Sequence, residues 1–164
     1  MPGANPDFQG LFVALDRHGV DYIVVGGVAA AAHGAPVTTF DLDIVHSRTR
    51  DNVSRLLAAL TELEATYRES TSRRLRPTAA GLAGPGHHLL VTRAGYLDVL
   101  GALTKERVYE DLLPGATEIV LPQDLRVRVL DLPMLITLKE ELGGEKDRAV
   151  LPVLRQTLRL RGGK

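Results

Sequence analysis

The sequence predicts an α/β (α+β) fold in which helices flank a mixed β-sheet. Short β-branched apolar runs alternate along the chain with longer segments in which apolar residues recur every three or four positions. Of the 164 residues, 45% are hydrophobic and 24% are charged, as in ordinary globular proteins and unlike disordered chains. A chain of this length has room for one continuous core, so we expect a single domain over residues 1–164.

Composition removes several classes of function. Twenty basic and twenty acidic residues cancel, so no net charge attracts nucleic acid or an anionic membrane, although a local basic patch remains open as an alternative. The chain has no cysteine, which excludes a disulfide framework and a thiolate metal site. Residues 1–9 lack the pattern of a secretory signal, and the most apolar stretch, residues 22–32, is about half the length of a membrane span. We therefore expect a cytoplasmic protein with no membrane partner.

The first predicted elements are a helix, a strand and a second helix. Residues 8–15 place apolar side chains at helical spacing. A β-branched run, residues 22–25, predicts a strand that stops at Gly26 and Gly27. The alanine-rich residues 28–33 then predict a helix, because alanine has the highest helix propensity. The order is strand, glycine turn, helix.

The next predicted strand, residues 38–45, has two different faces because successive side chains of a strand point to opposite sides. The polar face carries Thr39, Asp41 and Asp43. The apolar face carries Phe40, Leu42 and Ile44. Residues 53–63 follow with an apolar stripe at helical spacing, which predicts a helix that covers the sheet.

The remaining elements follow the same alternation. Residues 67–86 are rich in Arg, Ser, Thr, Gly and Pro, which predicts a surface loop with room for a short edge strand. Two strand-like runs, residues 88–92 and 96–100, predict a hairpin, and Asp98 interrupts the second run. The chain continues with a predicted strand, residues 127–130, and two helices separated by a glycine pair.

Asp41 and Asp43 lie about 7 Å apart along one strand face at roughly 3.3 Å per residue, so their carboxylates can converge on one ion. Magnesium takes oxygen ligands and keeps waters and substrate phosphates among them, so a few carboxylates suffice. For an isolated Asp-Leu-Asp, the ordinary alternative is the solvent face of an edge strand. Asp98 weakens that alternative because it lies in an apolar run, where an unpaired carboxylate is costly unless a cation neutralises it.

Gly26 and Gly27 predict an anion site beside these acids. Glycines let the backbone approach a ligand closely, and the helix that follows offers unpaired N–H groups and the positive end of its dipole. The alternative is an ordinary strand-to-helix turn, since glycine pairs are common at such turns. The combination of the glycine turn with three acids is more informative than either motif alone.

These motifs resemble the DNA polymerase beta-like nucleotidyltransferase superfamily. The resemblance lies in the order glycine pair, Asp-x-Asp and later Asp, in VVGGVAAAAHGAPVTTFDLDIV at residues 24–45 and YLDVLG at residues 96–101. Residues 135–154, LITLKEELGGEKDRAVLPVL, are similar to the helical end of small bacterial nucleotidyltransferases of the abortive-infection and toxin-antitoxin type. The resemblance spans most of the chain and implies a nucleotidyltransferase-like fold.

The resemblance also implies a reaction, a metal and a set of roles. Such enzymes use two Mg²⁺ ions to transfer a nucleoside monophosphate from ATP or another NTP to a hydroxyl acceptor, with release of pyrophosphate. Asp41 and Asp43 would bridge both metals, Asp98 would bind the catalytic metal, and Gly26 and Gly27 would hold the phosphates. The acceptor would be an RNA, a protein or a small molecule, and the resemblance allows for a toxin-antitoxin partner.

Three further residues are candidates for nucleotide binding. Lys139 and Lys146 lie in the C-terminal helices that the resemblance places near the triphosphate, and a compact ammonium suits a phosphate. The alternative for each lysine is a solvated helix face. Thr39 can hydrogen-bond a phosphate or a metal-bound water, although a threonine in a strand is commonly a good β-former and nothing more.

The sequence departs from the family at Val37, where related small proteins often have an arginine, so one phosphate or acceptor contact is in doubt. A dinucleotide-binding module is disfavoured because no G-x-G-x-x-G spacing follows the predicted strand. A sugar transferase that uses Asp-x-Asp is disfavoured by the length of the chain. The main alternative is a non-catalytic nucleotidyltransferase-like antitoxin or partner-binding module, against which the three aspartates argue.

Overall fold

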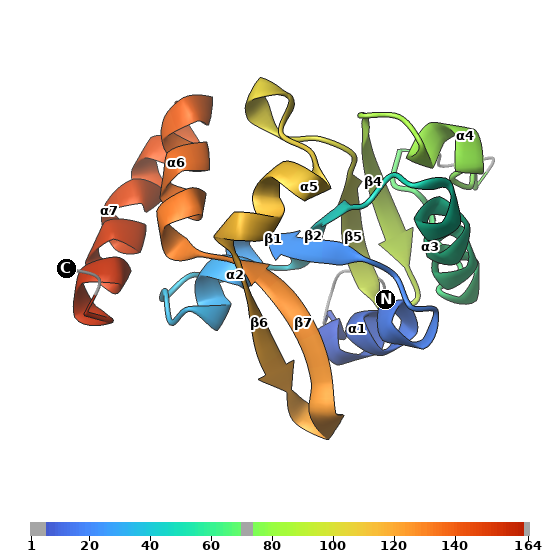
Figure 1. Cartoon of the computed structure of the whole chain (residues 1–164), viewed down its shortest axis with the longest axis horizontal. Helices are drawn as coiled ribbons and strands as arrows, with labels where there is room; N and C mark the ends of the chain where they lie inside the picture. Colours follow the sequence, from blue (N-terminus) through green and yellow to red (C-terminus); the bar gives the residue numbers. More distant parts are fainter. Residues whose placement is uncertain (1–5, 70–73, 163–164) are drawn as a thin grey trace.

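The computed structural model describes residues 6–69 and 74–162, and within them seven strands form one sheet in the order β3-β4-β5-β2-β1-β7-β6 (Figure 1). The strands are β1 Tyr22–Val25, β2 Asp41–His46, β3 Thr66–Tyr67, β4 His87–Thr92, β5 Gly95–Leu100, β6 Ala116–Leu121 and β7 Leu125–Leu130. The helices are α1 Phe8–Arg17, α2 Gly26–Ala32, α3 Arg50–Glu62, α4 Ala79–Leu82, α5 Tyr109–Leu112, α6 Leu132–Leu142 and α7 Glu145–Leu160. The predicted α/β fold, a mixed sheet flanked by helices, is confirmed.

The sheet is mixed because its central strands run in both directions. β2 pairs antiparallel with β1 and parallel with β5, and β1 pairs parallel with β7. Each side of the sheet ends in an antiparallel unit, the predicted β4–β5 hairpin with the short β3 at its edge and the β6–β7 hairpin. β2 and β5 are therefore direct neighbours, although about 50 residues separate them in the sequence.

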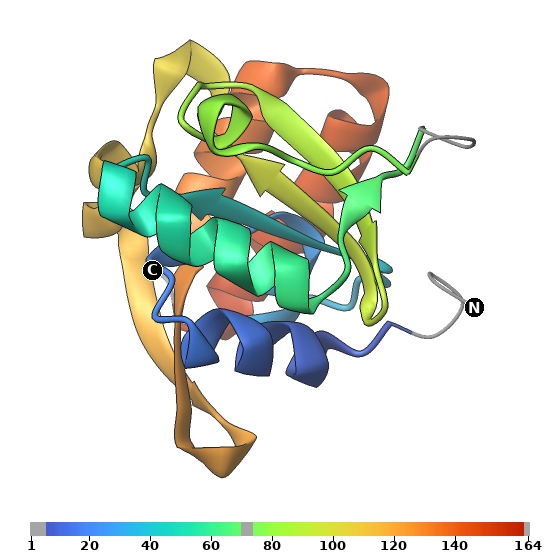
Figure 2. The same cartoon turned by 90° about the vertical axis from the view of Figure 1, so that its right-hand side faces the viewer.

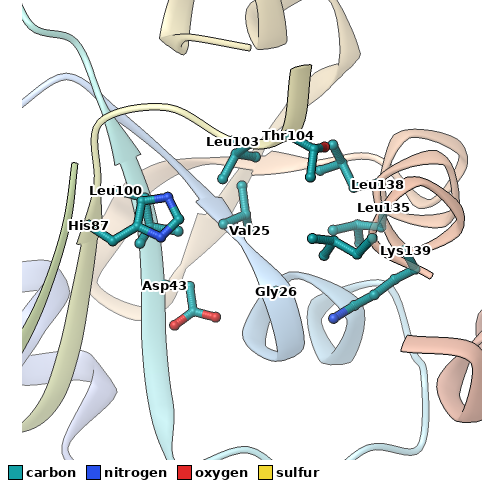
Figure 3. A pocket seen from close by; sticks show the side chains of 11 residues that line it. Val25, Gly26, Asp43, His87, Leu100, Leu103, Thr104, Leu135, Leu138 and Lys139 are labelled. Atoms are coloured by element: carbon teal, nitrogen blue, oxygen red, sulfur yellow. The ribbon is translucent and has the colours of Figure 1, made fainter. Parts of the chain in front are cut away.

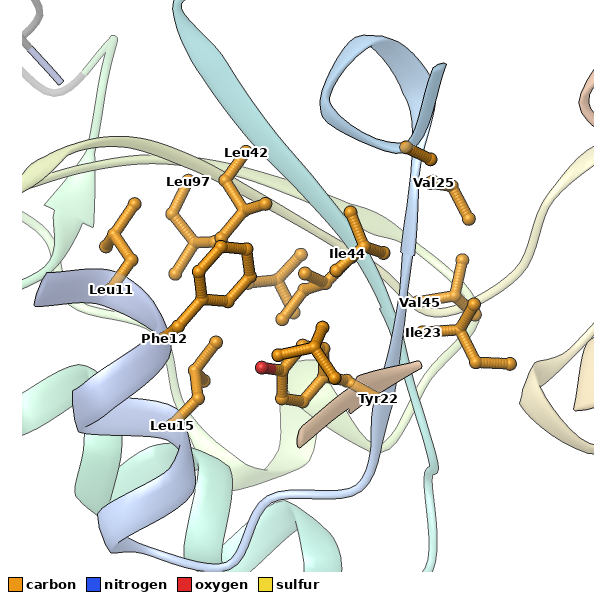
Figure 4. Packing of buried hydrophobic residues seen from close by; sticks show 14 of the residues in the cluster. Leu11, Phe12, Leu15, Tyr22, Ile23, Val25, Leu42, Ile44, Val45 and Leu97 are labelled. Carbon is orange, nitrogen blue, oxygen red and sulfur yellow. The ribbon is translucent and has the colours of Figure 1, made fainter. Parts of the chain in front are cut away.

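One face of the sheet packs on the hydrophobic core. Leu42 and Ile44 of β2 and Leu97 of β5 are fully buried and point toward α1 (Figure 4). α1 packs against them with an apolar stripe of Leu11, Phe12 and Leu15. Because side chains alternate along a strand, the residues between these core positions point to the other face. This alternation places the acidic residues of β2 and β5 on the face opposite α1.

The helices form two groups on opposite sides of the central strands. α1 and α3 lie side by side over one face, and α6 and α7 pack together on the other side of the molecule (Figures 1 and 2). α6 also contacts α2, the short helix that follows β1. The acidic face of β2 and β5 is therefore bordered by the α2 turn and by α6.

Some element boundaries differ from the sequence prediction. α2 begins at Gly26, so the glycine pair forms its first turn instead of preceding it. β2 begins at Asp41, which leaves Thr39 and Phe40 before the strand. β6 lay outside the predicted elements because it is an edge strand with largely exposed side chains, paired on one side to β7. The predicted loop at residues 67–86 contains α4, and its residues 70–73 lie outside the described residues.

No helix among the described residues is long and apolar enough to span a membrane. The organisation of residues 1–164 as one domain stays a prediction.

Candidate active site

Parallel pairing of β2 with β5 brings the predicted acids together. The register places Asp41 opposite Tyr96 and Asp43 opposite Asp98. On the far side of β2, Val25 at the end of β1 pairs with Asp43. Directly paired residues share one face of a sheet, so Asp43, Asp98 and the glycine turn after Val25 meet on the face that α1 leaves open.

The three carboxylates form an acidic cluster, which we define as Asp41, Asp43 and Asp98. One ligand oxygen from each residue lies within 4.8 Å of the others. Oδ1 of Asp43 is buried and has no hydrogen-bond partner among the described residues. A buried acceptor without a donor is costly, and several carboxylate oxygens at this spacing are the ligands that a hard divalent cation takes. The cluster therefore fits Mg²⁺, and the role of these residues as ligands stays a prediction.

The electrostatics of the cluster favour a cation. Burial and, after it, the neighbouring charge of Asp98 together raise the pKa of Asp43 from 3.8 to about 7. Burial also raises the pKa of Asp98, while the charge of Arg68 opposes this increase. Both carboxyl groups therefore resist ionisation in the folded protein, and a positive charge placed among them would relieve that cost.

Arg68 is a member of the site that the sequence analysis missed. It directly follows β3, and its guanidinium contacts Asp98 Oδ1 in an ion pair and lies 3.8 Å from Asp41 Oδ2. Its Nε and Nη2 donate to the carbonyl of Leu90 at 3.2 Å, and its Cζ lies 4.4 Å from the ring centroid of Tyr96. Nothing local distinguishes Arg68 from the other arginines of residues 67–86, since its position depends on the pairing of β3, β4 and β5.

Gly26 and Gly27 are required by close packing against the site. Gly26 has φ +70°, and a Cβ atom there would lie 2.3 Å from Asp43 Oδ2. A Cβ atom on Gly27 would lie 3.0 Å from Thr39, whose hydroxyl donates to the carbonyl of Asp41. The glycine turn therefore packs directly against Asp43, and the first backbone N–H groups of α2 lie beside the cluster.

An apolar cavity of about 200 Å³ opens next to Asp43 (Figure 3). Its apolar wall consists of Val25, Leu100, Leu103, Leu135, Leu138 and Leu142. Figure 3 shows Asp43 and Lys139 on either side of the Gly26 turn. His87, which the sequence analysis did not assign to the site, also lines this cavity, and its Nε2 lies 2.7 Å from the carbonyl oxygen of Ala102.

Four of the predicted nucleotide-binding residues share a second cavity of about 170 Å³. These residues are Gly26, Gly27, Lys139 and Lys146. Lys139 also lines the first cavity, so the two cavities adjoin at this side chain, and its ammonium lies 3.1 Å from Asp147 Oδ1. Val37, the position at which the sequence departs from the resemblance, lines the second cavity. Thr39 is apart from this group, although it packs on Gly27.

Comparison with known proteins supports the fold assignment. No protein-family profile and no curated protein sequence matches this chain. A candidate nucleotidyltransferase from Thermotoga maritima superimposes with a TM-score of 0.57 at 17% identity, covering 93% of this chain and 90% of that one. The antibiotic-resistance factor ANT(2'')-Ia superimposes with a TM-score of 0.57 at 15% identity, covering 95% and 83%. The chain therefore has the fold of these proteins, the nucleotidyltransferase fold.

Proposed function

We propose that this chain is a metal-dependent nucleotidyltransferase that transfers a nucleoside monophosphate from an NTP to a hydroxyl acceptor. The observation that carries the proposal is the acidic cluster, whose carboxylate oxygens converge within 4.8 Å beside the glycine turn. The fold alone does not define an activity, because one fold hosts many functions. The convergence of three acids from two strands at a glycine turn is the feature that the reaction requires.

The cluster would hold two Mg²⁺ ions. When bound, two such metal ions neutralise negative charge on the attacking and leaving oxygens of the phosphoryl group. Asp41 and Asp43, on one strand face, would contact both ions, and Asp98 would contact the one on the acceptor side. The unpartnered Oδ1 of Asp43 supports this role, because the folded chain supplies no other partner for it among the described residues.

The second cavity would bind the triphosphate. The first N–H groups of α2 lie there, and Lys139 and Lys146 add two positive charges. Asp147 holds Lys139 at 3.1 Å, which limits the conformations of this lysine before a phosphate arrives. Thr39 supports the turn by packing on Gly27, and we retain it as a nucleotide-binding candidate. The leucine-lined cavity next to Asp43 would take an apolar part of the nucleotide or the acceptor.

The experiment that tests the proposal is incubation of the full chain with Mg²⁺ and each NTP labelled at the α-phosphate. RNA, protein and small-molecule acceptors are offered separately, and antibiotics are included because one structural neighbour is an antibiotic-resistance factor. We expect label transfer with release of pyrophosphate, and loss of both in Asp43→Asn. Nucleotide binding without pyrophosphate release under all these conditions would favour the non-catalytic antitoxin or partner-binding module instead.

A further inference from the structure

Arg68 contributes a positive charge to the acidic cluster. Its guanidinium pairs with Asp98 Oδ1 and lies 3.8 Å from Asp41 Oδ2, so it faces two of the three acids at once. The side chains are largely shielded, with 24% of Arg68 and 15% of Asp98 exposed. At this degree of shielding an ion pair is screened less by solvent than a surface pair, so the contact affects how the cluster binds other cations.

The guanidinium is also held in place from two other directions. It donates twice to the carbonyl of Leu90 and lies over the ring of Tyr96, 4.4 Å from the centroid. The backbone N–H of Arg68 donates to the carbonyl of Leu89, which ties the residue to β4. A planar fork that hydrogen-bonds and stacks at once is specific to arginine, and lysine cannot reproduce it.

We propose that Arg68 is a positioning residue for Asp98 and that it competes with a divalent cation for the edge of the cluster formed by Asp41 and Asp98. This inference rests on the proposed metal site. Asp98 Oδ1 can accept the guanidinium or a metal ion, whereas Asp43 Oδ1 has no competing partner. The two ions are therefore not equivalent, because a cation at the edge formed by Asp41 and Asp98 meets the positive charge of Arg68, whereas a cation at Asp43 Oδ1 meets no such partner.

Competition with Arg68 explains why the edge formed by Asp41 and Asp98 differs from Asp43, which a metal site alone does not explain. Three carboxylates this close repel one another without a cation, and Arg68 relieves the repulsion at the edge formed by Asp41 and Asp98. Asp43 Oδ1, by contrast, has no hydrogen-bond partner among the described residues. Arg68 thus orients Asp98 and offsets its negative charge, and it leaves Asp43 open to the first ion.

The test is titration of the full chain with Mn²⁺, with free Mn²⁺ measured by electron paramagnetic resonance. For the wild type we expect one tight and one weak equivalent. For Arg68→Ala the weak equivalent should tighten by about 10-fold or more, because the second ion no longer meets a close positive charge. Arg68→Lys retains the charge and should stay closer to the wild type. The matched control is Arg126→Ala, which removes an exposed arginine paired with Glu118 on the β6–β7 hairpin.

The outcomes separate this inference from the proposed function. If folded Arg68→Ala binds Mn²⁺ like the wild type, or more weakly at both sites, the competition is wrong while the metal site stands. If neither wild type nor Arg68→Ala binds Mn²⁺, the metal site itself fails, and the inference fails with it. Circular dichroism confirms the fold of each variant, and Arg68→Lys provides the comparison if Arg68→Ala does not fold.

Discussion

The folded protein disfavours the ionised form of Asp43. Its pKa is raised from 3.8 to about 7, mainly by burial and then by the charge of Asp98. A carboxyl group with a raised pKa stabilises the fold below its unfolded pKa, and this contribution is lost as the pH rises through the folded value. Without metal, ionisation of Asp43 therefore costs stability between about pH 4 and pH 7. Above that window the cost is fully present.

This cost predicts the effect of Asp43→Asn on the metal-free protein. At pH 8 the variant should be more stable than the wild type by an amount on the order of 1–4 kcal/mol, because the amide has a similar size and no charge. At pH 4 the two proteins should have nearly equal stabilities, since Asp43 is then protonated. Urea unfolding at the two pH values in the presence of a chelator measures the difference. Equal stabilities at pH 8 would show that ionisation of Asp43 does not destabilise the fold.

The same residue predicts the pH dependence of metal binding. A divalent ion binds the ionised carboxylate, so protons compete with it wherever Asp43 is protonated. Between pH 5 and pH 7 the affinity of the wild type for Mn²⁺ should rise by about 10-fold per pH unit, and above pH 7 it should level off. Isothermal titration calorimetry over this range measures the slope. An Mn²⁺ affinity that does not change with pH below pH 7 would show that the metal does not bind Asp43.

The acids of the site could be predicted from the sequence, and Arg68 could not. Asp41 and Asp43 follow a local alternation of polar and apolar residues, and Asp98 interrupts an apolar run, so each leaves a signal within a few positions. The partners of Arg68 come from β2, β4 and β5, and their proximity depends on the order of strands in the sheet. No pattern around residue 68 contains that information.

At the scale of elements, the β1–α2 turn sets the distance between the helix and the acidic strand. Gly26 has φ +70°, and an added Cβ would lie 2.3 Å from Asp43 Oδ2. Gly34 provides a matched control, because it has φ +97° and nothing within 4 Å of an added Cβ. The positive φ disfavours alanine at both positions. Only at Gly26 would the added Cβ also lie too close to Asp43 of the acidic cluster.

We therefore predict different outcomes for Gly26→Ala and Gly34→Ala. Each substitution should cost about 1–2 kcal/mol from the positive φ alone. Gly26→Ala should in addition displace Asp43 and lower the affinity for Mn²⁺ by about 10-fold or more, as changes to residues that support metal ligands do. Gly34→Ala should leave that affinity unchanged. Unfolding and Mn²⁺ titration of both variants give the comparison. Equal Mn²⁺ affinities would show that the β1–α2 turn does not contribute to the metal site.

Elements also differ in how well the sequence indicates them. β2 was predictable because one of its faces is buried in the core and the other is polar, which gives a clear period of two. The edge strand β6 packs on one side only and has largely exposed side chains, so its period is weak. α2 was predicted to begin two residues late because glycine disfavours a helix by propensity, whereas the close approach to Asp43 and Thr39 requires glycine there.

At the scale of the whole molecule, the candidate site lies between two groups of elements. The sheet supplies the acidic cluster, the start of α2 supplies the glycine turn, and α6 and α7 supply Lys139 and Lys146. The ion pair of Lys139 with Asp147 and that of Glu140 with Arg155 join the two helices. A nucleotide bound to Gly26 and to Lys139 would therefore connect the sheet to the α6–α7 pair.

The lysines test whether this connection forms. Lys139→Gln should lower kcat/KM for the NTP by about 10-fold or more, mainly through a higher KM, because the amide stays polar but is one atom shorter and lacks the charge that would meet the phosphates. Lys105→Gln is the matched control, since Lys105 is an exposed lysine that also pairs with an acid, Glu141. It should change kcat/KM by less than about 3-fold. Equal effects of the two substitutions would place the triphosphate elsewhere.

Binding across the two groups also predicts stabilisation of the whole fold. A ligand that binds only the folded state adds about 2.7 kcal/mol at 100 times its Kd, which raises Tm by about 5–10 °C for a chain of this size. Mg²⁺ with NTP should give such a shift in the wild type and almost none in Asp43→Asn. If the nucleotide contacts α6 and α7 as proposed, their amides should also gain protection from hydrogen exchange, beyond that of the remote β6–β7 hairpin. A similar Tm shift in both proteins would mean that the nucleotide binds without Asp43, and protection confined to the sheet would exclude α6 and α7 from the site.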